Sequence, residues 1–489
     1  MSSNLKNKTV KGLGWSSVDS IASQGFSFIV GIVLARLLSP EEFGVIGIAM
    51  ILITLFDKIV DCGFSNALIR KQDTQEVDYN TTFIFNLVLS GFLYLICFLS
   101  APLVASFFHN EILIKVVRWI SLVLIINAFA IIQRTRLVKN IDFKTQAKVS
   151  VTASITSGCI GIALAYCGCG VWSLVGMQLS RQLCNTTLLW FFNKWAPKFE
   201  FSYSSFKQLF SYGGKLMLSG IIDTLCSELT VIFVGRIYTP ATLGQYSRAK
   251  QFTGIFTSNL STVVERVTYP VLSNIQDNKV QLIANYKKII RTLMLIVGVG
   301  TAFMAACAKS IVLILIGPKW IESILYMQLI SFVLITVPLK NFNLNLLQVY
   351  GRSDYILILS VIKRVIEVGA VFLGFIGMEW MIIGFAVAGI IGFLLNAYFT
   401  MKVSGYTVFQ QIRDLLPSLL ICSIVGLSMF IVTFFIQDIY LCLVLQIIIG
   451  ASLFFTLYEK LGFEEYVFVK SLVKEYLYYP LKRKFFHKN

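Results

Sequence analysis

Charged residues are scarce in this chain. Asp, Glu, Lys and Arg together make up 14% of its 489 residues, whereas soluble domains carry roughly 25%. Hydrophobic residues make up 56% of the chain. A surface that faces water on all sides cannot be built from this composition, so the sequence excludes a set of soluble domains and indicates a membrane protein.

Histidine and recognisable catalytic motifs are scarce as well. The two histidines, His109 and His487, both lie outside the apolar runs, which argues against a histidine proton relay or metal site. The ten cysteines mostly stand singly inside apolar runs, so we expect no disulfide or zinc framework. The Gly-rich phosphate loop of ATPases is also missing. We therefore predict a transporter without catalytic residues, metal or bound cofactor, and not an enzyme.

Long apolar runs fill the chain. A helix that spans a membrane needs about 20 mainly apolar residues, and it satisfies its own backbone groups in lipid. About fourteen such runs are present, joined by short connections, which predicts an all-α polytopic membrane protein. Their approximate bounds are 13–38, 43–68, 80–104, 112–132, 147–168, 171–193, 209–236, 242–268, 289–316, 321–349, 354–376, 379–401, 412–436 and 439–459.

Lys and Arg gather in alternate connecting segments. The formal net charge is +17, and cytoplasmic loops of membrane proteins carry an excess of Lys and Arg. We therefore predict that both termini are cytoplasmic and that the positive charge sets topology and does not bind nucleic acid. The basic segments expected to face the cytoplasm include 70–71, 134–148, 194–207, 279–291 and 402–413, whereas the loops near Pro40, Gly170, Pro240 and Pro318 are expected outside.

One segment of the chain recurs at an offset of 200 residues. The stretch from Arg36 to Gly44 (RLLSPEEFG) returns as Arg236 to Gly244 (RIYTPATLG). In each copy a Ser or Thr before the proline is typical of a helix N-cap, and Glu42 would complete a capping box in the first copy. The repeat predicts two pseudo-symmetric six-helix lobes at 1–197 and 198–402. Two additional helices and an amphipathic cytoplasmic tail follow at 403–489.

Several motifs together resemble a known family. The sequence resembles the Wzx-type polysaccharide flippases, of the branch with the colanic acid and teichuronic acid exporters. They belong to the superfamily of multidrug, oligosaccharidyl-lipid and polysaccharide exporters. The resemblance covers nearly the whole chain, and the residues that carry it are Trp15-Ser16, Leu34 to Gly44, Asn66 to Ile69, Gly168 to Val175, Leu243 to Ala249, Tyr269 to Ser273 and Gly317 to Trp320.

The resemblance implies a substrate and a cycle. Two lobes would open alternately to either side of the bacterial cytoplasmic (inner) membrane and move an undecaprenyl-pyrophosphate-linked oligosaccharide outward. The product would be a surface polysaccharide such as lipopolysaccharide or an exopolysaccharide, and the glycan is not implied. Membrane lipids, a polysaccharide polymerase and glycosyltransferases are the further candidate partners.

Cations inside the apolar runs are candidates for binding the pyrophosphate. Ionisable residues in a membrane are costly, and cations form strong charge-assisted hydrogen bonds with phosphate. Lys215, Arg248 and Lys250 are our first choices, since Lys215 has no carboxylate within one helical turn. The other candidates are Lys58, Arg181, Arg266, Lys340, Lys363 and Arg364. Asp57 and Asp61 could simply neutralise Lys58, and Glu367 at helical spacing could do the same for Lys363 and Arg364.

Carboxylates inside the lobes are candidates for coupling transport to a proton or sodium gradient. They are Asp19, Asp61, Asp223 and Glu228. Each could instead only neutralise a neighbouring cation. Asp223 and Lys215 lie about 80° apart around an ideal helix, whereas Asp223 and Glu228 diverge by about 140°. We therefore expect Asp223, and not Glu228, to share the side of its helix that bears Lys215.

Two other functions fit parts of the pattern. A cation-coupled multidrug antiporter would share the two six-helix lobes, but it would not need a basic cleft. A membrane glycan polymerase or ligase usually carries a large outside loop with Arg and His, whereas the predicted outside loops are short and hold one histidine, His109.

Overall fold

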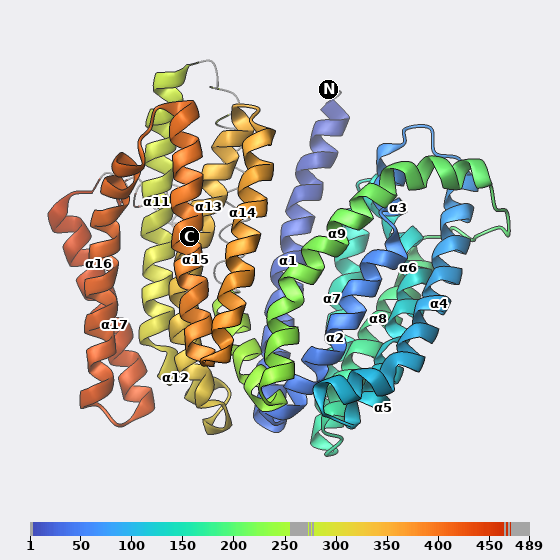
Figure 1. The fold of residues 1–489 in the computed structure, drawn as a ribbon, viewed down its shortest axis with the longest axis horizontal. Helices are drawn as coiled ribbons and strands as arrows, with labels where there is room; N and C mark the ends of the chain where they lie inside the picture. Colours follow the sequence, from blue (N-terminus) through green and yellow to red (C-terminus); the bar gives the residue numbers. More distant parts are fainter. Residues whose placement is uncertain are drawn as a thin grey trace, which may run out of the picture. The chain divides into compact units, whose positions relative to one another are not determined.

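The computed structural model describes residues 3–254, 272, 275, 278–463, 466–467 and 470, with side chains at 3–13, 16–18 and 353 left out. The described part contains helices and no strand. By contacts the chain divides into two compact units, residues 1–244 and 245–489. Each unit is a bundle of long helices (Figure 1). The prediction of an all-α polytopic membrane protein is confirmed.

Helices α1 to α9 lie within the described residues of the first unit. Helix α1 packs against α7, α7 against α8, α4 and α8 against α6, and α2 against α9. The bounds are α1 Ser3–Leu37, α2 Pro40–Asp61, α3 Phe64–Arg70, α4 Glu76–Phe108, α5 Ile112–Ile120, α6 Leu122–Lys139, α7 Phe143–Tyr166, α8 Val171–Phe192 and α9 Tyr203–Ile237.

In the second unit α11 packs against α13 and α16, while α15 packs against α13 and α14. Helix α17 packs against α12 and α16. The bounds are α11 Lys279–Ala306, α12 Ala308–Leu315, α13 Glu322–Val349, α14 Ser353–Phe372, α15 Met378–Ser404, α16 Val408–Phe435 and α17 Ile439–Leu461, with short 3₁₀ turns at Pro318–Trp320 and Leu373–Phe375. Residues 240–254 are also helical and link the two units along the chain.

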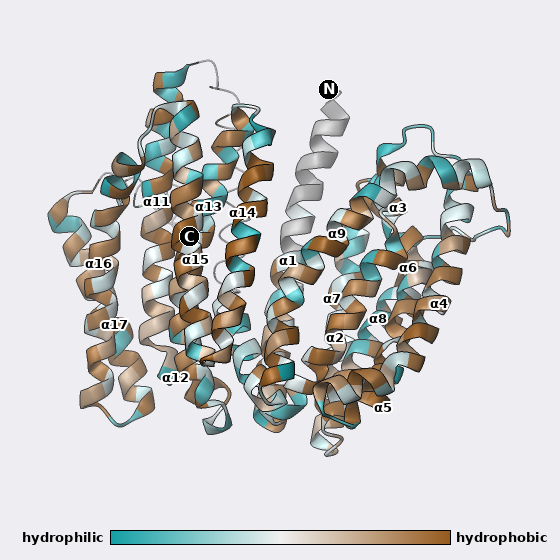
Figure 2. Cartoon of the chain, in the orientation of Figure 1, coloured by the Kyte–Doolittle hydropathy of each residue, from teal (hydrophilic) through white to brown (hydrophobic). Residues whose placement is uncertain are grey.

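The helices are apolar along most of their length, and hydrophilic residues gather in the connections (Figure 2). Among the described residues, 11 helical segments are long and apolar enough to cross a membrane. The other three predicted spans coincide with α8, α14 and the helix at 240–254, whose continuation lies outside the described residues. Helix α14 is not among the 11 because it has three charged residues, Lys363, Arg364 and Glu367, near its middle. The structure is thus compatible with the predicted fourteen.

Three predicted spans are interrupted, which the apolar runs did not reveal. The predicted run 43–68 breaks between α2 and α3, where Cys62 and Gly63 adopt left-handed conformations (φ 51° and 68°). Gly63 lies against Gly213, and a Cβ on Gly63 would come within 2.4 Å of the Gly213 carbonyl oxygen. The other two breaks are at Ser121 and Cys307. The residues at these breaks lie among apolar residues like those of the adjoining helices, so the apolar run in the sequence continues without a sign of the break.

The two copies of the repeated segment contact each other. Ser39 caps α2 in a capping box with Glu42, and the Thr239 hydroxyl accepts a hydrogen bond from the Thr242 amide (3.2 Å). A Cβ on Gly44 would lie 1.7 Å from the Pro240 carbonyl oxygen. A Cβ on Gly244 would lie 1.9 Å from the Pro40 carbonyl oxygen, which is the same contact with the copies exchanged. The predicted caps are confirmed, and the glycines permit a backbone approach that no side chain allows.

Helix α9 packs on α2, α3 and α4, so by contacts it belongs with the first unit. The predicted lobes at 1–197, 198–402 and 403–489 instead follow the sequence repeat, which starts its second copy at α9. Those boundaries stay a prediction.

Candidate functional site

A polar cavity of about 260 Å³ lies inside the first unit, between α1, α6, α7 and α8. Asp19, Arg134 and Arg181 line it. The carboxylate oxygen Oδ1 of Asp19 is buried and has no hydrogen-bond partner among the described atoms. The structure thus brings together two of the predicted residues, Asp19 and Arg181, and adds a second arginine.

Arg134 was expected in the basic cytoplasmic segment 134–148, because the predicted run ends at residue 132; the side of the membrane stays a prediction. Helix α6 continues to Lys139, so Arg134 is part of a helix and lines the cavity. Its guanidinium donates to the Asn127 Oδ1 atom at 3.5 Å. The signal for Arg134 in the sequence is its spacing of seven residues, two helical turns, from Asn127, and this spacing is too common to single it out.

Asn127 joins the cavity to the carboxylates of α2. Its side-chain amide donates to Asp57, and its oxygen also accepts from the Gln182 amide at 2.7 Å. Asp61, one turn further along α2, accepts a hydrogen bond from the Ser65 hydroxyl. Lys58, between the two carboxylates in sequence, is exposed. The network around this cavity therefore combines cations with carboxylates, since Asp19, Asp57 and Asp61 balance Lys58, Arg134 and Arg181.

A second cluster of charges lies within the second unit, on α13 and α14. The guanidinium of Arg364 pairs with Glu367 at 3.3 Å, one helical turn away, as the sequence spacing predicts. Lys340 and Lys363 interact electrostatically with this pair and Lys363 also with Lys340. The cluster combines three cations with one carboxylate, which leaves an excess of two positive charges.

The two lysines of this cluster are held by α15. A Cβ on Gly392 would lie 3.1 Å from Cδ of Lys340 and 3.4 Å from Cδ of Lys363, so both alkyl chains pass over this glycine. The Asn396 amide donates to the backbone carbonyl of Lys340 at 2.9 Å. Lys363 is the eleventh residue of the 20 in α14, so the cluster is at the middle of that helix.

The first-choice cations lie on two different helices. Lys215 is exposed on α9. Arg248 and Lys250 are on the helix at 240–254, where the Arg248 guanidinium donates to Gln251 and lies 6.0 Å from the centre of the Trp320 ring. Lys250 is exposed. Because Lys215 is in the first unit and the other two are in the second, their role as one site stays a prediction.

The remaining candidates do not gather with these. On α9, Asp223 is exposed and Glu228 is half-buried. Arg266 lies outside the described residues. No group of three or more His, Cys, Asp or Glu side chains in the described ranges is arranged to hold a metal ion.

Comparison with known proteins gives the family. A family model described as "Polysaccharide biosynthesis protein" matches residues 33–325, more than half of the chain. The lipopolysaccharide biosynthesis protein WzxC of Escherichia coli is 23% identical over 440 residues, 87% of this chain and 89% of WzxC. The teichuronic acid biosynthesis protein TuaB of Bacillus subtilis is 22% identical over 447 residues, 87% of this chain and 89% of TuaB.

The fold also has a counterpart among solved structures. The lipid II flippase MurJ in an inward closed conformation superposes with a TM-score of 0.71 at 16% identity, covering 92% of this chain and 99% of MurJ. At 16% identity this similarity establishes a shared fold and not a shared function. The match over 33–325 and the two relatives aligned along most of their length lead to one assignment: the chain belongs to the polysaccharide biosynthesis protein family.

Proposed function

We propose that this protein is a flippase that moves an undecaprenyl-pyrophosphate-linked oligosaccharide across the membrane by alternating access. The observation that carries the proposal is the cluster of Lys340 on α13 with Lys363 and Arg364 on α14, which places three cations around Glu367. Charges within apolar helices are costly, and the Arg364 side chain is still 43% exposed, so the cluster is accessible to a ligand of opposite sign. A pyrophosphate supplies that charge and accepts charge-assisted hydrogen bonds.

The family supports this substrate. WzxC and TuaB are named for the biosynthesis of lipopolysaccharide and teichuronic acid, and MurJ is named as a flippase of lipid II. None of these names describes an enzyme of glycan synthesis. The protein would therefore act as a transporter, with the polysaccharide polymerase and glycosyltransferases as partners that make and use its substrate.

The charge of the cluster also separates this function from multidrug antiport. A carrier of cationic drugs gains nothing from an excess of positive charge within its helices, because like charges repel the ligand. A glycan polymerase or ligase would need an extramembrane loop for chemistry. In the part of the chain that the structure describes, the longest connection between two helices, at 193–202, has no room for a catalytic domain.

The protein would reside in the bacterial cytoplasmic membrane with both termini in the cytoplasm. In support, segments predicted to be cytoplasmic meet at one end of the first unit, where Arg136 pairs with Glu76 at 3.0 Å and the Trp195 indole donates to the same carboxylate. Segments predicted to be outside meet elsewhere, where Gly170 lies beside Glu42. Labelling of a Lys139→Cys variant by a thiol reagent from outside intact cells would show that the orientation is the reverse of the proposed one.

Transport would be coupled to a proton or sodium gradient through a carboxylate of the first unit. Of the candidates Asp19, Asp61, Asp223 and Glu228, Asp19 has the strongest structural support because its Oδ1 atom is buried in the cavity beside two arginines. A cation bound there would favour one state of the cycle. Asp19→Asn should reduce the gradient dependence of flipping more than Glu228→Gln does. Unchanged dependence in both Asp19→Asn and Asp223→Asn would exclude these carboxylates from coupling.

The other predicted cations, Lys58, Arg181, Lys215, Arg248 and Lys250, remain candidates for guiding the pyrophosphate or the glycan. Lys215→Ala is the informative variant among them, since this exposed side chain can be removed at little cost to folding.

Deletion of the gene tests the proposed function. We expect lipid-linked oligosaccharide to accumulate on the cytoplasmic face and the surface polysaccharide to disappear, because assembly of the repeat units does not need the flippase. Reintroduction of the wild-type gene is the control. A deletion strain with normal surface polysaccharide and increased sensitivity to cationic drugs would instead support a multidrug antiporter.

A further inference from the structure

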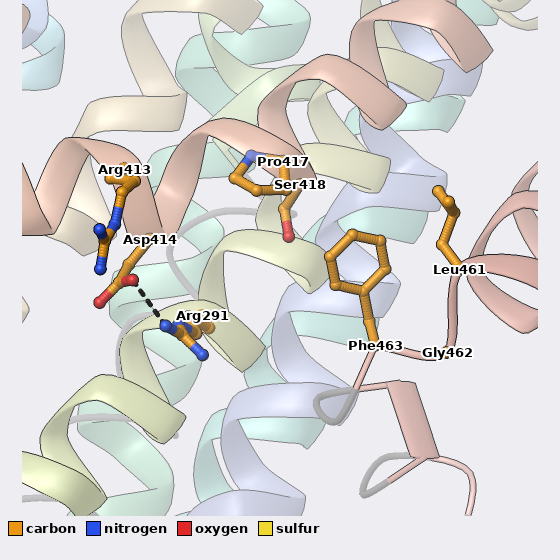
Figure 3. A pocket seen from close by; sticks show the side chains of 8 residues that line it. All are labelled: Arg291, Arg413, Asp414, Pro417, Ser418, Leu461, Gly462 and Phe463. Carbon is orange, nitrogen blue, oxygen red and sulfur yellow. Dashed lines mark hydrogen bonds and ion pairs between the residues drawn. The ribbon is translucent and has the colours of Figure 1, made fainter.

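A pocket of about 400 Å³ lies in the second unit (Figure 3), and no residue of the α13–α14 cluster lines it. Arg291 of α11 and Arg413 of α16 line one side of it. Phe463, which follows the end of α17, lies across from them, and Ser418 of α16 is between the two sides (Figure 3). Arg413 and the end of α17 place the pocket near the ends of two membrane-spanning helices.

The one carboxylate of the pocket is fully engaged. Asp414 pairs through Oδ1 with Nη2 of Arg291 at 2.6 Å and accepts through Oδ2 from the Tyr406 hydroxyl, also at 2.6 Å. Burial and the bond to Asp414 raise the pKa of Tyr406, so its hydroxyl stays a donor at neutral pH. The Asp414 side chain is 6% exposed, whereas that of Arg291 is 34% exposed. The carboxylate is hidden, while part of the Arg291 side chain is exposed and lines the pocket.

Positive charge exceeds negative charge around this pocket. Lys287, one turn before Arg291 on α11, has its ammonium 4.7 Å from the centre of the Tyr406 ring. Arg413 is exposed at the pocket. Among the described residues of this region, Lys287, Arg291 and Arg413 therefore surround Asp414, and such an excess of cations attracts an anion.

The other walls of the pocket include apolar side chains. Pro417, Leu461 and Phe463 line them. Helix α16, which contributes Arg413 and Pro417 to the pocket, also exposes a row of large apolar side chains at helical spacing. This row consists of Ile412, Leu416, Leu420 and Ile424, which are 40%, 46%, 55% and 53% exposed.

We propose that this pocket binds the headgroup of an anionic phospholipid. The phosphodiester would contact Arg413 and the exposed part of Arg291, and the acyl chains would lie along the apolar row of α16. Basic pockets between transmembrane helices suit such headgroups, because the arginines bind phosphate at the depth where the lipid carries it. The apolar walls select a lipid over a free anion. The site is separate from the transport cluster, and the proposal does not depend on the transported substrate.

The test uses the full-length protein in a neutral detergent, with Tm measured against added lipid. Phosphatidylglycerol should raise Tm, because a ligand that binds only the folded state stabilises it, while phosphatidylcholine and inorganic phosphate should not. Arg413→Gln should lower the apparent affinity for phosphatidylglycerol about tenfold, the loss of one charge-assisted hydrogen bond. Phe463→Ala should weaken binding as well by removing the apolar wall.

Lys460→Gln is the matched control, because Lys460 is exposed at the end of α17 but does not line the pocket. It should bind phosphatidylglycerol like the wild type. Equal effects of Lys460→Gln and Arg413→Gln would overturn the proposal in favour of general surface electrostatics. An equal rise of Tm with inorganic phosphate would overturn the assignment to a lipid, and an equal rise with phosphatidylcholine would overturn the role of charge. The lipid-free Tm of each variant confirms folding.

Discussion

The double variant Lys340→Gln with Lys363→Gln is expected to abolish polysaccharide export while the protein stays in the membrane. The two changes remove the excess charge of the α13–α14 cluster and leave the pair of Arg364 and Glu367 intact. Hydrogen bonds from charged groups contribute about 1.5–3 kcal/mol each. Two of them amount to roughly 10²–10⁴ in affinity for the pyrophosphate. Export is measured as surface polysaccharide in the deletion strain.

Thermal stability separates this functional role from a structural one. Lys340 and Lys363 repel each other in the native state, so their removal should leave Tm unchanged or raise it. The control Lys340→Arg with Lys363→Arg keeps the charge and should retain part of the export. Lys309→Gln, an exposed cation on α12, should export normally. Normal export by the double glutamine variant would remove the cluster from the mechanism.

A methyl group at residue 44 is expected to destabilise the protein strongly. In Gly44→Ala the new Cβ would lie 1.7 Å from the Pro240 carbonyl oxygen, a backbone atom that cannot rotate away. Overpacking costs about 1–3 kcal/mol where side chains can adjust, so we expect at least that loss here. Gly244→Ala, which meets the Pro40 carbonyl oxygen at 1.9 Å, should behave alike because the two contacts are equivalent. The measurement is Tm in detergent with protein level in membranes.

Gly91→Ala is the control for this effect. It lies within α4, and nothing is found within 4 Å of its added Cβ. Alanine is the better helix former, so Gly91→Ala should be as stable as the wild type or slightly more stable. Wild-type stability of Gly44→Ala would show that the two repeat copies do not pack as described.

Most of the architecture could be predicted from the sequence, because spanning helices are determined by apolar length alone. The caps at Ser39 and Thr239 could be predicted too, since a cap depends on neighbouring residues only. The break at Gly63 could not, because it depends on contact with Gly213, 150 residues later in the chain. The same holds for the close approach of Gly44 to Pro240.

The candidate site shows the same limit. The pair of Arg364 and Glu367 follows from spacing on one helix, and the structure confirms it. The approach of Lys340 to Lys363 is a contact between two helices and has no local signal. That Arg134 is still part of α6 could not be predicted, because the polar end of this helix looks like a loop when only hydropathy is considered. Whether Lys215, Arg248 and Lys250 act together stays a prediction.

The most direct test of the central claim is a flipping assay in proteoliposomes with a labelled undecaprenyl-pyrophosphate-linked oligosaccharide. Accessibility of the glycan to a membrane-impermeant reagent reports its movement between leaflets. We predict that the glycan crosses rapidly with the wild-type protein and no faster than in empty liposomes with the Lys340→Gln and Lys363→Gln double variant. Equal rates in wild-type proteoliposomes and protein-free liposomes, in the presence of an imposed proton or sodium gradient, would contradict the account.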